Sequence, residues 1–223
     1  MREGKPIRRI TEAATRPGVG RPTRAQQEQR HEELLNAALD FFLEKGFEPT
    51  TMEDIATHVG MSKRTVYARY ADKAALFKAA VHRAVQRYTV PREAIDAVAT
   101  DNLEATLTAV ARLRIANLAT PVATKLQRIL NAQSYRFPEL LSASFEEGTG
   151  PTISFLCDLF TRYTALGELN LTEPRRAATA FLSLVVGGPA RIILSGKALD
   201  EQEIATRVRF AVRLFLDGAR PRD

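Results

Sequence analysis

Residues 55–66 read IATHVGMSKRTV, and the spacing of three of them restricts how the chain can fold. Two short helices joined by a tight turn can cross steeply only under three conditions. A small residue must lie at the crossing, a glycine must allow positive φ in the turn, and an apolar residue of the second helix must fill the corner. Ala56, Gly60 and Val66 meet these conditions, and Ile55 and Val59 add apolar contacts. The segment therefore predicts a helix-turn-helix core.

Amphipathic periodicity predicts a long helix before this unit. Apolar residues recur at three- and four-residue spacing within 24–45, and Gly46 follows as a left-handed cap. Thr50 as N-cap and Glu53 three residues later form a capping box. We expect this box to open the short helix that ends near Val59.

The remainder of the chain is also predicted to be helical. Ser62 caps a helix that continues to about Tyr70, and Asp72 caps a fourth helix that runs to about residue 88. Further helices are expected around 94–119, 122–136, 138–147, 151–166, 173–195 and 200–217, with breaks near Pro121, Pro138, GTGP at 148–151 and GELNLT at 167–172. The predicted fold class is all-α, with about nine or ten helices in a three-helix helix-turn-helix unit and a larger helical unit.

The positive charge is concentrated at the start of the chain. Of the net charge of +6, residues 1–90 carry +5 and residues 91–223 carry +1. We expect a flexible basic arm at 1–23, which is either a solubilising tail or a cationic segment that meets phosphates or a minor groove. Domain boundaries are expected at 24–88 and 89–223.

Cations in the first turn of the helix that Ser62 opens require an explanation. The helix dipole disfavours them there by a few tenths of a kcal/mol, about 0.3 or more, so a phosphate-bearing partner explains them better than stability does. The first turn of a recognition helix reaches base edges in the major groove, where Arg64 suits a guanine and Thr65 or Ala68 a thymine methyl. The predicted DNA-contacting residues are Arg21, Arg24, Thr51, Met52, Ser62, Lys63, Arg64, Thr65, Tyr67, Ala68, Tyr70 and Lys73. A solvated face with one packed tyrosine is the alternative.

Residues 20–83, above all TTMEDIATHVGMSKRTVYARYADKAALF, resemble the DNA-binding domain of the TetR family of bacterial transcriptional regulators. Tyr70 stands where phenylalanine is usual, and Ala75 where a glutamate often completes the cap of the fourth helix. The segment NAQSYRFPELLSASFEEGTGP is similar, more loosely, to the C-terminal domain of one TetR subgroup. The resemblance implies a homodimer on a palindromic DNA operator, most often a repressor that a small-molecule effector releases from DNA.

The resemblance also implies that residues 89–223 bind the effector and form the dimer through the last two long helices. The candidate interface residues are Phe181, Leu184, Ile192, Phe210 and Leu214. The candidate ligand-pocket residues are Arg114, Gln127, Tyr135, Phe145 and Phe155. Packing inside one subunit explains the apolar members of both sets almost as well, and solvent exposure explains the two polar ones.

Other functions remain as alternatives. A DNA-binding regulator without an effector, constitutive or activating, has the same N-terminal features. A helical enzyme is disfavoured because the three histidines lie on separate predicted helices without metal spacing, and no nucleophile elbow or phosphate-binding glycine loop occurs. We predict no cofactor, metal site or membrane partner. A lone Cys157 in an apolar stretch and the lack of a signal-peptide pattern indicate a cytoplasmic protein, associated with the nucleoid when bound to DNA.

Overall fold

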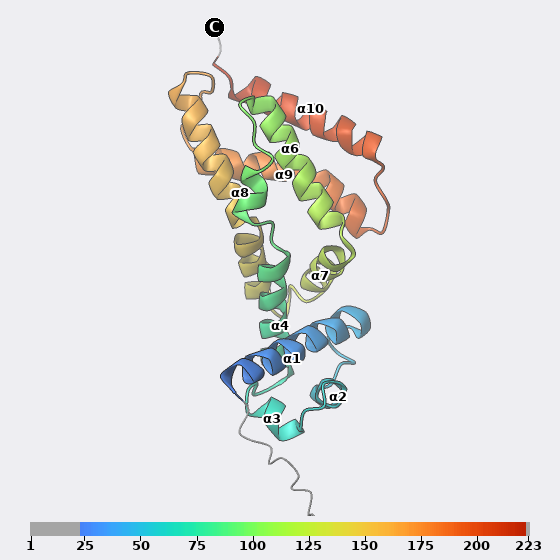
Figure 1. Cartoon of the computed structure of the whole chain (residues 1–223). Coiled ribbons are helices and arrows are strands. Elements are labelled where there is room, and N and C mark those ends of the chain that lie inside the picture. The colour runs from blue at the N-terminus through green and yellow to red at the C-terminus, as the bar shows by residue number, and fades with distance from the viewer. Residues whose placement is uncertain (1–22, 222–223) are drawn as a thin grey trace, which may run out of the picture.

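The computed structural model describes residues 23–221, which form ten α-helices and no strand (Figure 1). The helices are α1 (Arg24–Lys45), α2 (Met52–His58), α3 (Lys63–Tyr67), α4 (Lys73–Tyr88), α5 (Arg92–Asp96), α6 (Leu103–Ala119), α7 (Pro121–Ala132), α8 (Pro138–Ala165), α9 (Pro174–Leu194) and α10 (Glu201–Ala219). The all-α prediction is confirmed. The predicted basic arm, including Arg21, lies outside the described residues.

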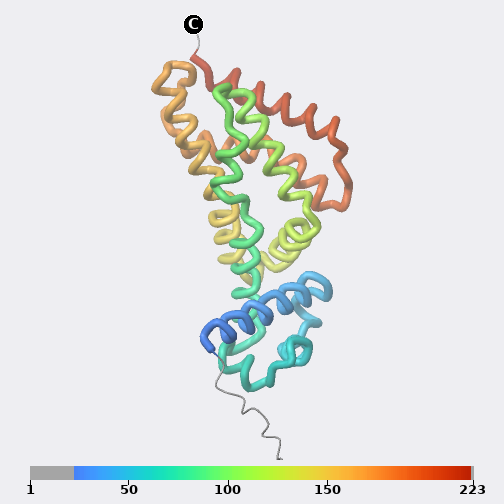
Figure 2. The backbone as a smooth tube through the Cα atoms, viewed as in Figure 1, coloured from blue at the N-terminus to red at the C-terminus, as the bar shows by residue number. Residues whose placement is uncertain are grey.

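The helices form an elongated molecule with α1, α2 and α3 at one end and α6, α9 and α10 toward the other (Figures 1 and 2). Helices α4 and α8 run between the two ends and pack against each other. The end of α10 lies far from α1 to α3 (Figure 2). The two ends of the molecule are therefore connected chiefly through α4, α7 and α8.

Two hydrophobic clusters make up the core. One joins the buried residues of α1 to α4 with residues of α7 and the start of α8, including Leu126, Leu130 and Phe137. The other joins α5, α6, the second half of α8, α9 and α10. Because residues 126–140 pack with α1 and α4, the first cluster extends well beyond the helix-turn-helix segment itself.

Helix α8 runs without interruption through GTGP, so the predicted break at 148–151 is wrong. Pro151 lacks the N–H that would bond the carbonyl of Glu147, yet both halves of the helix are held by packing. Leu140 anchors the first half in one cluster, and Phe155 and Phe160 anchor the second half in the other. Tertiary packing therefore overrides the local breaker. In contrast, the single helix expected over 94–119 is two helices, because Asn102 caps a new start at α6.

Two predicted caps in the helix-turn-helix region differ from the structure. The N-cap of α2 is Thr51, whose side chain accepts from the Asp54 N–H at 3.1 Å. Thr50 is buried and donates its hydroxyl to the Gly46 carbonyl at 2.7 Å. Gly46 has a positive φ of 88° but a ψ of 172°, so it ends α1 without the left-handed conformation. Ser62 is the cap of α3 as predicted, although the helix ends at Tyr67 rather than near Tyr70.

Candidate nucleic-acid interface and ligand cavity

The turn between α2 and α3 has the geometry that its sequence predicts. Ala56 and Val66 are buried at 2% and 0% exposure, and Ile55 is fully buried beside them. Gly60 adopts φ +61°, a conformation that side-chain-bearing residues rarely adopt. The Met61 N–H closes the turn on the Ala56 carbonyl at 2.9 Å. Because Val66 fills the corner between α2 and α3 on the buried side, the N-terminal tip of α3 is exposed to solvent.

The exposed tip of α3 carries one cation without a partner. The Ser62 side chain accepts from the Thr65 N–H at 3.1 Å and lies 2.8 Å from the Thr65 hydroxyl. Lys63 pairs with Glu53 at 3.2 Å. Arg64 is exposed, and no described residue hydrogen-bonds or ion-pairs with its guanidinium. None of its five donors is used by a residue within 23–221, so they are available to a bound partner.

Glu53 organises the base of this tip from α2. It accepts a hydrogen bond from the Tyr67 hydroxyl at 3.3 Å as well as the ion pair with Lys63. Hydrogen bonding to its own backbone N–H, followed by the bond with Lys63, lowers the pKa of Glu53. The carboxylate therefore stays ionised and positions both side chains. Tyr67 remains 45% exposed, and Ala68 is exposed beside it.

Besides Lys63 and Tyr67, which contact Glu53, and Arg24, which pairs with Glu28 at 3.0 Å, three further predicted DNA contacts are engaged within the chain. Met52 is 4% exposed and packs in the core, so a DNA contact from its side chain is a wrong prediction, since the first turn of α2 points it inward. The Tyr70 hydroxyl lies 2.6 Å from His31 Nε2 on α1, and the ring packs on the first cluster. The Lys73 ammonium donates to the Glu48 carbonyl at 2.9 Å and lies 4.6 Å from the Phe47 ring centre. Thr51 and Arg24 are exposed.

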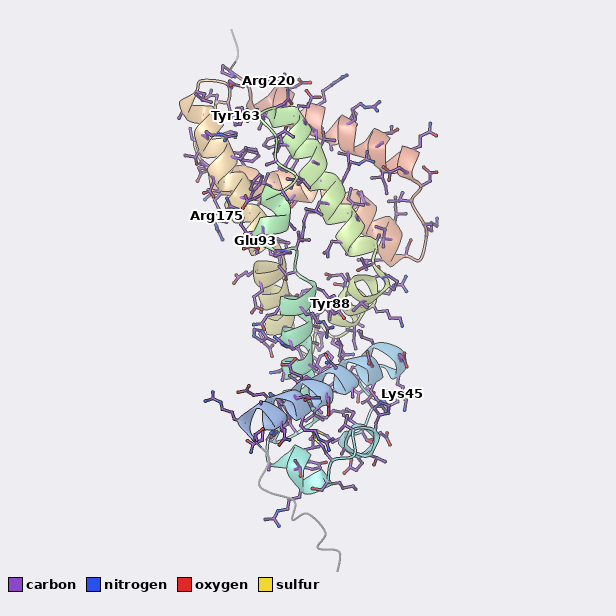
Figure 3. All side chains as sticks on the ribbon, viewed as in Figure 1. Lys45, Tyr88, Glu93, Tyr163, Arg175 and Arg220 are labelled. Carbon is purple, nitrogen blue, oxygen red and sulfur yellow. The ribbon has the colours of Figure 1, made fainter. Side chains whose placement is uncertain are left out.

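A cavity of about 710 Å³ lies where α4, α6, α7, α8 and α9 approach one another. Its wall is mostly apolar, with Val85 from α4, Leu118 from α6 and Leu130 from α7. Tyr88, at the C-terminal end of α4, also lines it and is labelled in Figure 3. This volume lies within the range of about 300–1,000 Å³ that small-molecule sites occupy.

Three of the five predicted pocket residues line this cavity, namely Arg114, Gln127 and Phe145. The other two predictions are wrong. Tyr135 lies in the turn between α7 and α8 with its side chain fully exposed. Phe155 is buried at 6% exposure in the second cluster, where the Arg92 guanidinium lies 5.3 Å from its ring centre. Phe155 is close in sequence to the residues of α8 that line the cavity, but its side chain packs in the second cluster instead.

Arg114 is the one arginine or lysine that lines the cavity. Its Nη1 donates to the Gly148 carbonyl at 3.1 Å, whereas its Nε is buried without a partner. Burial lowers the pKa of the Arg114 guanidinium, and no described carboxylate contributes to the shift. Water is therefore partly removed from a positive charge that the chain does not neutralise.

Two protein-family models match the chain, one in its N-terminal part and one in its C-terminal part. The model of the N-terminal domain of bacterial regulatory proteins of the tetR family matches residues 34–80, and that of the AefR-like transcriptional repressor C-terminal domain matches residues 105–218. The chain belongs to the TetR family. The resemblance expected from the sequence is thereby confirmed, and transcription regulation by DNA binding is the function of the family.

Relatives of known structure share the fold over almost the whole TetR-family chain. A TetR-family regulator from Mesorhizobium loti is 26% identical, with a TM-score of 0.74 over 90% of this chain and 100% of its own. The flavonoid-responsive regulator FrrA is 30% identical, with a TM-score of 0.71 over 88% of this chain and 100% of its own.

Curated relatives match the DNA-binding end. The HTH-type transcriptional regulator YdeS of Bacillus subtilis is 38% identical over 73 residues, which are 32% of this chain and 35% of YdeS. The chain thus spans about a third of the length of the curated relatives that it matches.

The last two helices of this TetR-family chain expose apolar side chains. Leu184 on α9 is 40% exposed, and Phe210 and Leu214 on α10 are 69% and 51% exposed. We call these three residues the α9–α10 face. Ile192 is half-buried. Phe181 is fully buried against Phe160 and Phe215, so its assignment to an interface is wrong.

Helix α9 is unusually apolar for a helix on the outside of a subunit. Among residues 23–221 it is the one helix long and apolar enough to cross a membrane by length and composition. It packs instead against α6, α8 and α10. Only 28% of its most apolar stretch is buried within the subunit. Most of its other apolar residues are partly or fully buried, and Leu184 is the one large apolar side chain that α9 exposes.

Proposed function

We propose that the chain is a homodimeric, cytoplasmic repressor that binds a palindromic DNA operator and leaves it when a small molecule enters the cavity. The observation that carries this proposal is the exposed tip of α3 with its unpartnered Arg64, on a helix-turn-helix that shares one hydrophobic cluster with the cavity wall. A regulatory rather than an enzymatic role is favoured, because the matched family models and relatives are described as transcriptional regulators.

The tip of α3 suits the major groove. Arg64 can reach a guanine edge with two parallel hydrogen bonds, and Lys63 and Tyr67 on the same helix would contact phosphates. Two such tips, related by a twofold axis, read half-sites about one helical turn apart, roughly 34–36 Å. DNA contacts from one subunit alone are therefore only half of the proposed interface.

The α9–α10 face supports the proposed dimer. A monomer exposes the apolar side chains of Leu184, Phe210 and Leu214 to water, and association with a second copy would cover them. A second copy of the chain covers the same surface on both subunits, since a twofold interface is self-complementary. The dimer also fixes the distance between the two α3 tips.

Helix α4 supports the proposed coupling between cavity and DNA. Its first half carries Leu76 and Phe77, which are buried with the helix-turn-helix, and its last turns carry Val85 and Tyr88, which line the cavity. A ligand that displaces the end of α4 therefore moves α1, which packs along α4, and through α1 and α2 it moves the recognition helix. A shift of a few ångströms, about 3 Å, is enough to spoil simultaneous docking of two half-sites.

Helix α7 supports a second route. Leu126 and Leu130 line the cavity and belong at the same time to the cluster around α1 and α4. Repression rather than activation is supported by the description of the matched C-terminal domain, and response to a small molecule by the name of FrrA. The second candidate is a regulator that binds DNA without an effector.

Selection of fragments bound by the purified full chain from random duplex DNA tests the proposal. We expect enrichment of an inverted repeat and a steep loss of affinity as salt rises, since several phosphates are neutralised. Recovery of no preferred sequence at low ionic strength would contradict the DNA-binding part. An operator whose affinity stays constant across a broad library of small molecules would favour the regulator without an effector.

Replacement of Arg64 by alanine is expected to weaken operator binding by about 1–3 kcal/mol per contacted base pair and to relax the preference at that position. The physical reason is the loss of a bidentate bond to a guanine edge. Competition binding against operators with single base changes measures it. Arg64→Lys is the matched variant, because lysine keeps the charge but not the planar fork.

If Arg64→Ala weakens binding equally on every DNA sequence, Arg64 does not read a base. Lys63→Ala provides the contrast. We expect it to weaken all sequences alike and to lower the slope of log affinity against log salt by about one unit.

A further inference from the structure

The cavity combines a mainly apolar wall with one uncompensated positive charge. Val85, Leu118, Leu126, Leu130 and Val186 are among its apolar residues. Arg114 lies among them with its Nε buried and unpartnered. A guanidinium that loses water without gaining a carboxylate is unfavourable, and such a group in a cavity is a candidate for ligand binding.

The free donors of Arg114 lie on one edge of the guanidinium. Nη1 is used by the Gly148 carbonyl, whereas no described residue accepts from Nε or Nη2. Nε–H and the neighbouring Nη2–H point in the same direction and form the fork that binds the two oxygens of a carboxylate. The ligand atoms that fit this edge are therefore a pair of anionic oxygens.

The other polar groups of the wall are largely engaged by the chain. The Asn117 side chain donates to the Tyr88 carbonyl at 3.1 Å, and the Gln127 side chain donates to Asn131 at 3.1 Å. Glu146 also lines the cavity, but it is exposed and contributes nothing to the pKa of Arg114. Arg114 therefore provides the main polar group of the wall that is free to bind a ligand.

We infer that the effector is an amphipathic carboxylic acid, whose carboxylate binds Arg114 and whose hydrocarbon body lies against the apolar wall. This inference rests on the proposed function, because it names the class of ligand that would release the DNA. A neutral apolar molecule fills the same volume but leaves the guanidinium uncompensated.

The position of Arg114 also explains how an acid could be sensed. Its bond to the Gly148 carbonyl ties α6 to α8 at the point where α8 meets α4. A Cβ added at Gly148 would lie 3.9 Å from Val85 Cγ1 and 4.0 Å from Thr89 Oγ1, so the backbone of α8 is close to the end of α4 there. A carboxylate bound on the free Nε/Nη2 edge leaves the Nη1 bond to Gly148 in place, so a shift of the guanidinium toward the ligand is passed to α8 beside the end of α4.

The test compares acids with alcohols of equal length on the full-length chain. Octanoate, decanoate and dodecanoate are titrated at neutral pH, where their carboxyl groups are ionised, against 1-octanol, 1-decanol and 1-dodecanol. Calorimetry measures binding, and fluorescence anisotropy of the selected operator measures release. We expect at least one acid to bind about ten- to a hundred-fold more tightly than its alcohol and to release the operator.

Arg114→Met and Arg114→Lys test the residue itself. Methionine keeps an unbranched apolar side chain and should reduce acid binding about ten- to a hundred-fold, to the level of the alcohol, while leaving alcohol binding unchanged. Lysine keeps the charge without the fork and should retain part of the preference. Arg112→Met is the control, because Arg112 lies on the same helix but pairs with Glu201 outside the cavity.

Three results would overturn the inference: no binding of any acid to the unmodified chain, equal binding of acid and alcohol, or an Arg114→Met variant that still prefers the acid. Operator affinity without any ligand is recorded in the same anisotropy assay. A chain that binds its operator but ignores the acids therefore contradicts the ligand class and leaves the DNA-binding proposal standing. Circular dichroism of Arg114→Met, together with the Arg114→Lys data, separates loss of the site from loss of the fold.

Discussion

The double variant Phe210→Glu and Leu214→Glu is expected to be a monomer that has lost most of its affinity for a full operator. Both side chains project from α10, 69% and 51% exposed in the single subunit. A dimer that buries them must then desolvate four carboxylates without partners, which costs several kcal/mol, about 3–5 or more. Loss of the second half-site contact reduces affinity by roughly 10²–10⁴. Analytical ultracentrifugation measures the mass, and operator titration measures the affinity.

The control for this variant is Leu166→Glu, because Leu166 is 64% exposed at the end of α8 and lies outside the α9–α10 face. It should remain dimeric and bind the full operator normally. Affinity for an isolated half-site should be the same for all three proteins, since the tip of α3 is untouched. A double variant that stays dimeric would show that the subunits meet through another surface.

The helix-turn-helix could be predicted from the sequence because its determinants are local. Ala56, Gly60 and Val66 lie within eleven residues, and their positions follow from the sterics of one tight turn. The cap of α2 was harder to assign, since Thr50 with Glu53 and Thr51 with Asp54 have the same spacing. Burial decides between them, because the Thr50 hydroxyl is used by the carbonyl of Gly46.

The cavity and the apolar face depend on how long helices rotate against one another, which sequence periodicity does not fix. Helix α9 is mostly apolar, so its pattern alone does not separate residues that face the subunit core from those that could face a second subunit. Phe181 faces the core whereas Leu184, three residues later, is exposed. Arg114 was recognisable as a polar residue on an apolar helix, but its missing partner became visible only with the neighbouring helices in place.

Phe77→Ala is expected to lower the free energy of unfolding by about 3–5 kcal/mol. Phe77 is fully buried, and its ring centre lies 5.0 Å from those of Phe42 and Phe47 and 5.4 Å from that of Phe137. Truncation removes the ring that contacts α1, the loop after it and the start of α8. It also leaves a cavity, which these elements can close only by moving. Urea denaturation followed by circular dichroism measures the loss.

Tyr135→Ala is the matched control, because it removes an aromatic ring two residues before Phe137 that is fully exposed to solvent. Its effect should stay within about 0.5 kcal/mol. A second consequence separates Phe77 from a purely stabilising residue. Since Phe77 joins Phe42 of α1 to Phe137 at the start of α8, the folded fraction of Phe77→Ala at low temperature should bind operator with a weaker response to effector. A variant destabilised by less than about 1 kcal/mol would mean that the aromatic cluster around Phe77 does not hold the DNA-binding end to α8.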